Sequence, residues 1–306
     1  MRAETFTLSA RDGASIHVYR WLPEGEVRAI VQIAHGMAEH AARYARFAEA
    51  LTAAGYAVYA DDHRGHGKTA EERELGHFGD ERGWERVLSD LLALGARAKS
   101  EHPGKKLVYF GHSMGSFFGQ AILQRSAREY DAMILSGTNA PGSVLERAGT
   151  AVARLERLRG GLRGKSALLA FLSFGSFNDA FKPARTEFDW LSRDPAEVDR
   201  YVADPRCGFR CTNELWVQLL EGLHAIATGG FGTVPKDFPV HLLAGDRDPV
   251  SRGGKGVVEL HDRLRSAGLT RTSLRLYPEA RHEMLNETNR EEVTRDLVEV
   301  LAGMTA

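Results

Sequence analysis

The chain has 306 residues, and its 40 Lys and Arg against 41 Asp and Glu give a formal net charge of −1. This balance argues against the basic face that nucleic-acid binding needs, so no nucleic-acid partner is expected. Two cysteines are too few for a secreted disulfide framework, the first residues carry no apolar signal segment, and no apolar run reaches 18 residues. We therefore expect a cytoplasmic protein with one large α/β domain.

Predicted strands and helices alternate over residues 1–138. TFTLSARDGASIHVYRWLP predicts two strands joined by a tight turn, and RAIVQIAHG, YAVYADD, KKLVYFGHS and YDAMILSG each predict one more. Helices are predicted between them at ARYARFAEALTAAG, ERGWERVLSDLLALGARAKS and MGSFFGQAILQRSA. The alternation returns over residues 236–306, with strands at FPVHLLAGD and TSLRLYP and helices at GKGVVELHDRLRSAG and NREEVTRDLVEVLAG. This order predicts a mostly parallel, eight-stranded sheet with helices on both faces.

Residues 139–235 interrupt that order. ERAGTAVARLERLRGG and KSALLAFLSFG predict helices, and irregular, aromatic-rich segments are expected after them. We interpret residues 139–235 as an inserted helical lid, or cap, on a core formed by residues 1–138 and 236–306. Such a lid would cover the carboxyl ends of the strands, where open α/β sheets bind ligands.

Ser113 lies in the pentapeptide Gly-His-Ser-Met-Gly, between a predicted strand and a predicted helix. In that context Gly-x-Ser-x-Gly is typical of a nucleophile elbow, a strained turn that exposes the serine hydroxyl. Side chains at Gly111 and Gly115 would collide with the neighbouring strand and helix. The N-terminus of the helix adds partial positive charge beside a developing oxyanion. We predict Ser113 as a nucleophile.

A nucleophilic serine needs a base and a carboxylate that orients the base, and here the expected chain order is Ser, acid, His. His282 follows the last predicted strand and is the predicted base. Asp246 and Asp248 both follow the strand before it. Asp246 could cap the turn through its side chain, whereas Asp248 lies far enough past the strand to reach His282. We therefore favour Asp248 as the acid.

Two backbone N–H groups are expected to bind the oxyanion. Met114, the residue after the predicted nucleophile, supplies one. The other is expected from Met37, in the segment QIAHGMAEH that ends the third predicted strand, where Gly36 would allow the turn.

Neither a metal nor a cofactor is expected. His35 and His40 have no visible third ligand. Cys207 and Cys211 have no further His or Cys close by in the sequence, and we interpret them as structural thiols.

The segment SALLAFLSFGSFNDAF would give the lid an apolar wall for an acyl chain. The side chains proposed to bind substrate there are Leu169, Phe171, Leu172, Phe174 and Phe177. Alternatively they pack a small core of the lid itself, and one apolar face can serve both purposes. At most a transient contact with a membrane surface is expected.

Five segments carry a family resemblance: HGMAEHAARY, DDHRGHGKT, GHSMGS, GDRDPVS and ARHEMLNE. Together they resemble the α/β-hydrolase branch that contains monoacylglycerol lipases and lysophospholipases, with proline iminopeptidase-like enzymes as relatives. The resemblance implies an α/β-hydrolase fold with Ser113, Asp248 and His282 as catalytic residues and Met37 and Met114 as oxyanion donors. It also implies architectural roles for the polar residues Glu39, His40, Arg43, Asp62, Arg64 and His66.

We expect a serine carboxylic-ester hydrolase that acts on mono-acyl lipids (a monoacylglycerol or a lysophospholipid) or on similar hydrophobic esters. The alternative is an amide or peptide hydrolase of the proline iminopeptidase type, which needs acidic groups in the lid to hold a substrate amine. Candidates for that role are Asp179, Glu187, Asp189, Asp194 and Glu197. A non-catalytic receptor on the same fold is disfavoured by the complete catalytic set. The sequence indicates no oligomeric state.

Overall fold

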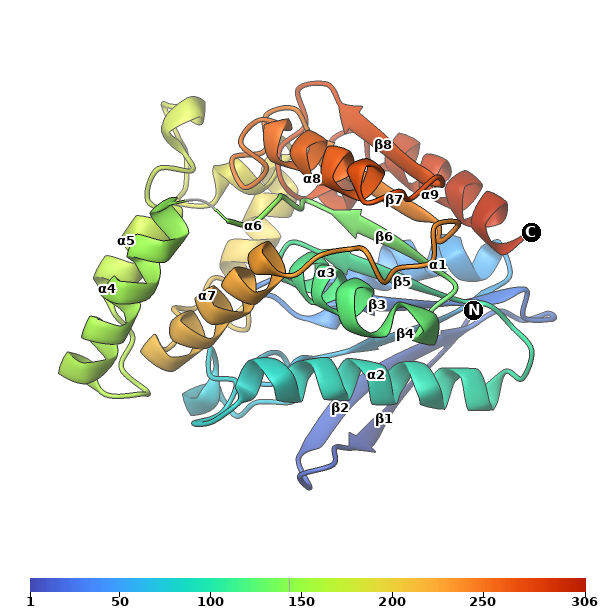
Figure 1. Cartoon of the computed structure of the whole chain (residues 1–306), viewed down its shortest axis with the longest axis horizontal. Helices are drawn as coiled ribbons and strands as arrows, with labels where there is room; N and C mark the ends of the chain where they lie inside the picture. Colours follow the sequence, from blue (N-terminus) through green and yellow to red (C-terminus); the bar gives the residue numbers. More distant parts are fainter. Residues whose placement is uncertain (143) are drawn as a thin grey trace.

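Within residues 1–142 and 144–306, which the computed structural model describes, eight strands form one sheet (Figure 1). The strands are β1 (Arg2–Ser9), β2 (Ser15–Leu22), β3 (Ala29–Ala34), β4 (Tyr56–Asp61), β5 (Leu107–His112), β6 (Ala132–Ser136), β7 (Val240–Gly245) and β8 (Thr272–Tyr277). Their order across the sheet is β1-β2-β4-β3-β5-β6-β7-β8. The pairs β1–β2 and β2–β4 are antiparallel, and every other neighbouring pair is parallel. The predicted eight-stranded, mostly parallel sheet is confirmed.

Helices cover both faces of this sheet, as predicted. They are α1 (Ala45–Ala53), α2 (Gly83–Glu101), α3 (Met114–Ser126), α8 (Lys255–Ser266) and α9 (Arg290–Thr305). Leu91 of α2, Phe118 of α3 and Leu260 of α8 belong to the apolar core on one face, and Leu51 of α1 and Leu297 of α9 belong to the core on the other. Every residue of β3 to β7 is buried, which explains why these strands read as apolar runs rather than alternating patterns.

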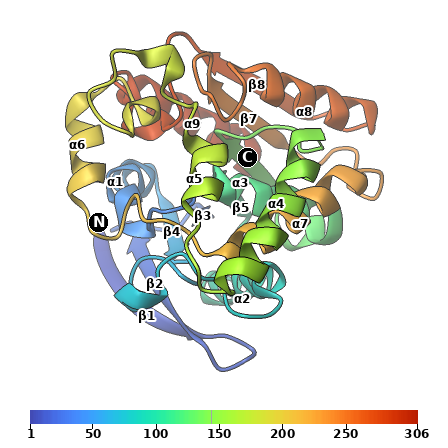
Figure 2. The ribbon, with the colours of Figure 1, turned by 90° about the vertical axis from the view of Figure 1, so that its left-hand side faces the viewer.

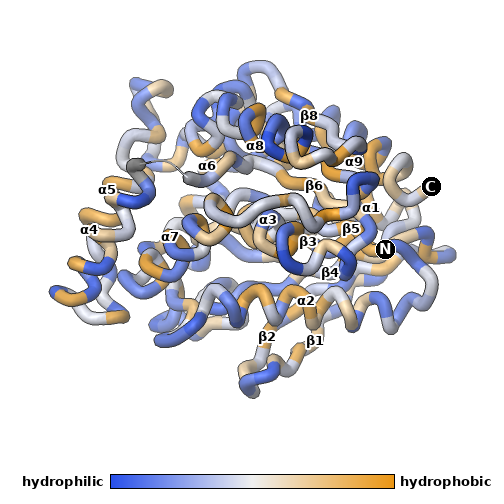
Figure 3. Tube along the Cα trace, viewed as in Figure 1, coloured by the Kyte–Doolittle hydropathy of each residue, from blue (hydrophilic) through white to orange (hydrophobic). Residues whose placement is uncertain are grey.

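The chain between β6 and β7 carries four helices in its described part. They are α4 (Val144–Gly160), α5 (Ala167–Phe174), α6 (Pro195–Ala203) and α7 (Asn213–Thr228). Figure 1 shows α4 and α5 at one end of the molecule, and in Figure 2 they lie in front of α3 and the central strands. Figure 3 shows hydrophobic and hydrophilic residues interspersed along α4, whereas α5 is almost entirely apolar in sequence.

The expectation of irregular structure after α5 is wrong for α6 and α7. Both helices begin at a side-chain cap of the kind that normally marks a helix start. The carboxylate of Asp194 accepts a hydrogen bond from the Ala196 N–H at 2.9 Å, and the hydroxyl of Thr212 accepts one from the Leu215 N–H at 3.2 Å.

None of the helices in the described residues is both long enough and apolar enough to cross a membrane.

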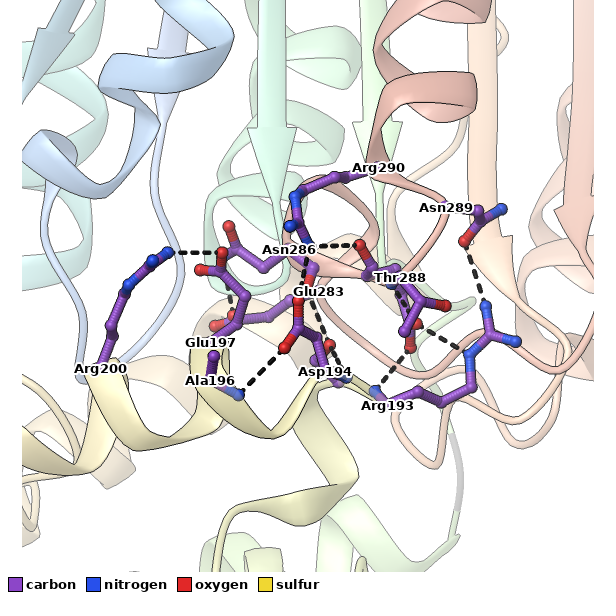
Figure 4. Close-up of polar contacts among 12 residues, drawn as sticks. Arg193, Asp194, Ala196, Glu197, Arg200, Glu283, Asn286, Thr288, Asn289 and Arg290 are labelled. Atoms are coloured by element: carbon purple, nitrogen blue, oxygen red, sulfur yellow. Dashed lines mark hydrogen bonds and ion pairs between the residues drawn. The ribbon is translucent and has the colours of Figure 1, made fainter.

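The start of α6 is tied to the segment that leads into α9 (Figure 4). Arg290 donates to the Asp194 carboxylate at 2.7 Å, and the guanidinium of Arg193 donates to Asn289 at 3.1 Å and to Glu287 at 2.8 Å. The fully buried Glu287 carboxylate also accepts from three backbone N–H groups, at 2.8 to 3.1 Å. These contacts join the insertion to the core at one place.

We predict that Glu287→Ala lowers the free energy of unfolding by about 3–5 kcal/mol, because it leaves a cation and three buried N–H groups without their acceptor. Glu221→Ala is the matched control, because its ion pair with Arg154 is exposed and should change that free energy by about 1 kcal/mol or less. Urea denaturation measures both. An equal loss of unfolding free energy in the two variants would show that the contacts of Glu287 do not stabilise the fold more than an exposed ion pair does.

Candidate active site

Ser113 stands in a strained backbone conformation directly after β5, at the start of α3. Its φ of +51° and ψ of −118° are unfavourable for a residue with a side chain and cost roughly 1–3 kcal/mol. A Cβ at Gly111 would lie 2.5 Å from the Gly115 carbonyl oxygen, and one at Gly115 would lie 2.1 Å from that of Ala34. The elbow therefore requires glycine at both positions, and the predicted strain and its steric reason are confirmed.

The loops after β7 and β8 bring Asp248 and His282 together. Asp248 Oδ1 and His282 Nδ1 are 2.9 Å apart, and both side chains are buried. Burial alone would lower the pKa of His282, but the adjacent Asp248 carboxylate more than offsets it and holds that pKa above its usual value. The imidazole also stacks at an angle on Trp190, with 5.2 Å between ring centroids. Ser113 and His282 line the same pocket.

The structure gives the places of the two predicted oxyanion donors, Met37 and Met114. Met114 is the first residue of α3, and Met37 lines the pocket beside Gly36. The expected reason for Gly36 is wrong, because the residue with the left-handed φ in this loop is Ala38, at +55°. Gly36 is needed for space: a Cβ there would lie 2.8 Å from the carboxylate of Glu39 and 3.2 Å from Ser113 Cβ.

A buried arginine connects the loop that carries Met37 to the loop that carries His282, which we call the histidine loop. The Arg43 guanidinium donates to Glu39 at 2.6 Å and to both carboxylate oxygens of Glu283 at 2.7 Å. Burial opposes the charge on Glu283, yet Arg43 holds the pKa of that carboxyl below its usual range. Glu39 in turn accepts the Gly36 N–H at 2.5 Å. The residue after His282 and the loop that carries Met37 are thus held by one cation.

The pocket has a volume of about 430 Å³. Phe171 and Phe174, predicted from the sequence, line it. The other three predicted lid residues are not among its lining residues: Leu169 is buried in the main core, Leu172 is 54% exposed, and Phe177 packs against Trp190.

Several lining residues escaped the sequence analysis: Phe188, Trp190, Leu191, Tyr201, Phe209, Trp216 and Val250. The aromatic-rich composition around residue 188 is the signal that could have found the first of them. Of the five acidic lid residues considered for amine binding, Glu187 lines the pocket, at its exposed rim. The other four hold hydrogen bonds or ion pairs elsewhere, such as the cap of α6 by Asp194.

One group of possible metal ligands stands out among the described residues. Ligand atoms of His40, Asp204 and Cys207 lie within 4.8 Å of one another. His40 Nε2 and an Asp204 carboxylate oxygen are already paired at 2.9 Å, and burial raises the pKa of the Cys207 thiol. Because a thiol binds metals as the thiolate, this chemistry disfavours a metal. The absence of a metal stays a prediction.

Comparisons with known proteins agree on one family. The family model described as "Serine aminopeptidase, S33" matches residues 25–289. The chain is 31% identical over 287 residues to a monoacylglycerol lipase of Mycolicibacterium smegmatis, covering 90% of this chain and 89% of that one. It is 28% identical over 284 residues to human monoglyceride lipase, covering 90% and 82%. A solved carboxyl esterase from Bacillus coagulans, in complex with glycerol, has a TM-score of 0.91 over the whole of both chains at 26% identity.

We predict that Asp248→Asn lowers the pKa of His282 to below the usual value for histidine, because burial then acts without the adjacent carboxylate. In the unaltered protein the imidazole should titrate above that value. An NMR titration of the histidine ring signals measures both. Asp246→Asn, on the same loop, is the control and should leave the titration unchanged. A wild-type midpoint below the usual value for histidine would contradict the expectation.

Proposed function

The chain belongs to the serine aminopeptidase S33 family of α/β-hydrolases and is a serine hydrolase of the esterase and monoacylglycerol lipase type, and we propose that it hydrolyses carboxylic esters of mono-acyl lipids. The proposed substrates are monoacylglycerols, lysophospholipids or similar hydrophobic esters. We propose Ser113, Asp248 and His282 as the catalytic residues.

The hydrogen bond between Asp248 and His282 is the observation that carries this proposal. It fixes the histidine proton on Nδ1, and this leaves Nε2 as the acceptor that a base needs. The same histidine lines the pocket into which the strained turn places Ser113. The shared pocket of Ser113 and His282, with Asp248 hydrogen-bonded to that histidine, supports the roles of nucleophile, base and orienting acid.

The proposed reaction has two halves. Ser113 Oγ attacks the ester carbonyl as His282 Nε2 takes its proton, and the Met37 and Met114 N–H groups bind the oxyanion. When the intermediate collapses, His282 gives the proton to the leaving alcohol and the acyl group stays on Ser113. Water then attacks the acyl-enzyme with His282 as base, and this releases the fatty acid and restores the serine.

The pocket wall supports an apolar acyl group. Phe171 and Phe174 of α5 line it together with Trp190, Trp216 and Val250. Apolar walls with a few placed polar groups are typical of sites for small hydrophobic ligands. The names of the relatives, monoacylglycerol lipase and carboxyl esterase, support the same class of substrate.

We propose that residues 139–235 act as the lid of this site. Large apolar side chains on α4, on α5 and on the turn between them are exposed by 38% to 81%: Leu155, Leu158, Leu162, Leu168, Phe171 and Leu172. This cluster supports a transient contact with a lipid surface that would deliver the substrate beside the pocket. A cytoplasmic location stays a prediction.

Hydrolysis of an amide or peptide is the second candidate function. The observation that favours it is Glu187 at the pocket rim, where a carboxylate could bind a substrate amine. Against it stands the aromatic and aliphatic lining around that residue. The two functions differ in the substrate that is turned over faster, a monoacylglycerol or a prolyl arylamide.

We predict that Ser113→Ala lowers kcat for p-nitrophenyl butyrate by about 10⁴-fold or more, because no other group can form the acyl-enzyme. The variant should also lose labelling by a fluorophosphonate probe, as seen by in-gel fluorescence. Ser126→Ala, at the far end of α3, is the control and should label normally. Undiminished labelling of Ser113→Ala would falsify the assignment.

We predict that Phe171→Ala lowers kcat/KM for a dodecanoyl ester about tenfold relative to an acetyl ester, because it removes apolar contact with the longer chain. Leu172→Ala is the matched control, since Leu172 is similarly exposed but is not among the lining residues. A panel of p-nitrophenyl esters and monoacylglycerols, with a prolyl arylamide beside them, gives the measurement. Flat rates over chain length, or faster turnover of the arylamide, would contradict the lipid substrate.

A further inference from the structure

Three buried histidines lie behind the loop that carries Met37, and the proposed reaction uses none of them. His35, His63 and His66 are at most 1% exposed. The rings of His35 and His63 are stacked, with 3.9 Å between centroids, and His66 lies 5.2 Å from His35. His35 directly follows β3, and the other two belong to the segment after β4. We call residues 36–39, next to His35, the oxyanion loop.

The hydrogen bonds of His35 fix its protonation state. Its Nε2 accepts the backbone N–H of His63 at 3.0 Å, so that nitrogen carries a lone pair and no proton. The ring proton is therefore on Nδ1, which donates to the carbonyl oxygen of Gly36 at 2.7 Å. Burial, together with the neighbouring His63, lowers the pKa of His35 well below its usual value, in agreement with a neutral ring.

The side chain of His63 binds the backbone carbonyl of His35. Its Nδ1 lies 2.8 Å from the carboxylate of Asp61, and its Nε2 lies 3.3 Å from the carbonyl oxygen of His35. Both partners are acceptors, so both ring nitrogens of His63 carry protons. Burial opposes that charge, but Asp61 raises the pKa of His63 above its usual value. A buried imidazolium, neutralised by Asp61, thus fastens the end of β3.

Two successive peptide units are held as a result. The peptide between His35 and Gly36 is bound at its oxygen by His63 and at its N–H by the Glu39 carboxylate. The next peptide is bound at its oxygen, the Gly36 carbonyl, by His35. It is a trans peptide, so its N–H, that of Met37, points away from its oxygen. With the oxygen turned toward the buried histidine, the N–H faces the opposite side, where Gly36 and Met37 line the pocket with Ser113.

We propose that His35 is a positioning residue that aims the Met37 N–H at the oxyanion by holding the Gly36 carbonyl. This inference rests on the proposed ester hydrolysis and adds a residue to it. An oxyanion donor is effective because it already points at the developing charge and need not reorient during the reaction. Without the imidazole donor, the peptide between Gly36 and Met37 would be free to rotate, and its carbonyl would be buried without a partner.

Two amide variants separate the two sides of the ring. The side-chain amide of His35→Asn lies near the place of Nδ1 and can donate to the Gly36 carbonyl, whereas that of His35→Gln lies near the place of Nε2 and cannot. Relative to wild type, we expect His35→Gln to lower kcat for p-nitrophenyl butyrate about 100-fold with KM within twofold, because an oxyanion donor acts in the transition state. His35→Asn should keep kcat within about tenfold of wild type.

A trifluoromethyl ketone inhibitor reports on the same contact, because its adduct with serine carries an oxyanion. Its Ki should rise in His35→Gln by about the factor that kcat falls. His66→Phe is the control, because it also removes a buried imidazole from the cluster. Titration with a fluorophosphonate counts the active sites in each sample. The kcat of His66→Phe per active site should equal that of wild type.

Equal kcat values in His35→Asn and His35→Gln would overturn the proposal, as would a loss that appears in KM alone. Should His35→Gln fail to fold, as judged by its melting temperature, His35→Phe fills the ring volume without a donor and takes its place. Failure of the proposed function looks different, because wild type would then hydrolyse no ester or Ser113→Ala would retain the activity.

Discussion

The buried guanidinium of Arg43 is the interaction on which the geometry of the site depends. It lies between Glu39, which is four positions before it in the chain, and Glu283, which is 240 positions after it. Three charges out of water are costly unless every one is paired and hydrogen-bonded. The extra negative charge is met by neutral donors, because Glu39 also accepts from the Gly36 N–H and Tyr44, and Glu283 from Asn286. The same contacts that neutralise the cluster therefore set the distance between the oxyanion loop and the histidine loop.

A second set of contacts joins the segment at Trp190 and Leu191 to the loop that carries His282 and Glu283. The N–H groups of His282 and Glu283 donate to the carbonyls of Trp190 and Leu191, at 3.4 and 2.8 Å. Just beyond, the start of α6 is held by the ion pairs of Figure 4. The part of the insertion over His282 is thus continuous with the core through hydrogen bonds. Most of the large exposed apolar side chains lie on α4, on α5 and on the turn between them, although Val202 of α6 and Val258 of α8 are exposed as well.

Local patterns were enough to predict the sheet, because its buried strands are apolar runs set between helices with clear periodicity. They were also enough to place Ser113, Asp248 and His282 at strand ends. They failed where the cause is a contact between distant segments. Gly36 looked like a turn residue, but the need for glycine there comes from Glu39 and Ser113. Trp216 carries no local mark of a pocket, because the place of its helix depends on contacts with distant segments, such as the hydrogen bond from the Thr212 N–H to the Gly76 carbonyl. Helix α7 was missed although Thr212 is a good cap, because its aromatic and apolar residues follow a long irregular stretch.

The residues proposed to catalyse the reaction and those proposed to select the substrate are held in place by different kinds of interaction. Strain at Ser113 persists because Gly111 and Gly115 let α3 approach β5 and β3 closely, a steric arrangement that a rigid sheet can maintain. The charges of Arg43, Glu39 and Glu283 near it are buried and paired, and paired buried networks of this kind are rigid. The lid wall offers mainly apolar contact, which is additive over area and tolerant of shape. The proposed reaction therefore depends on residues of the core, whereas we propose that the side chains of α5 and the aromatic residues beside it select the substrate.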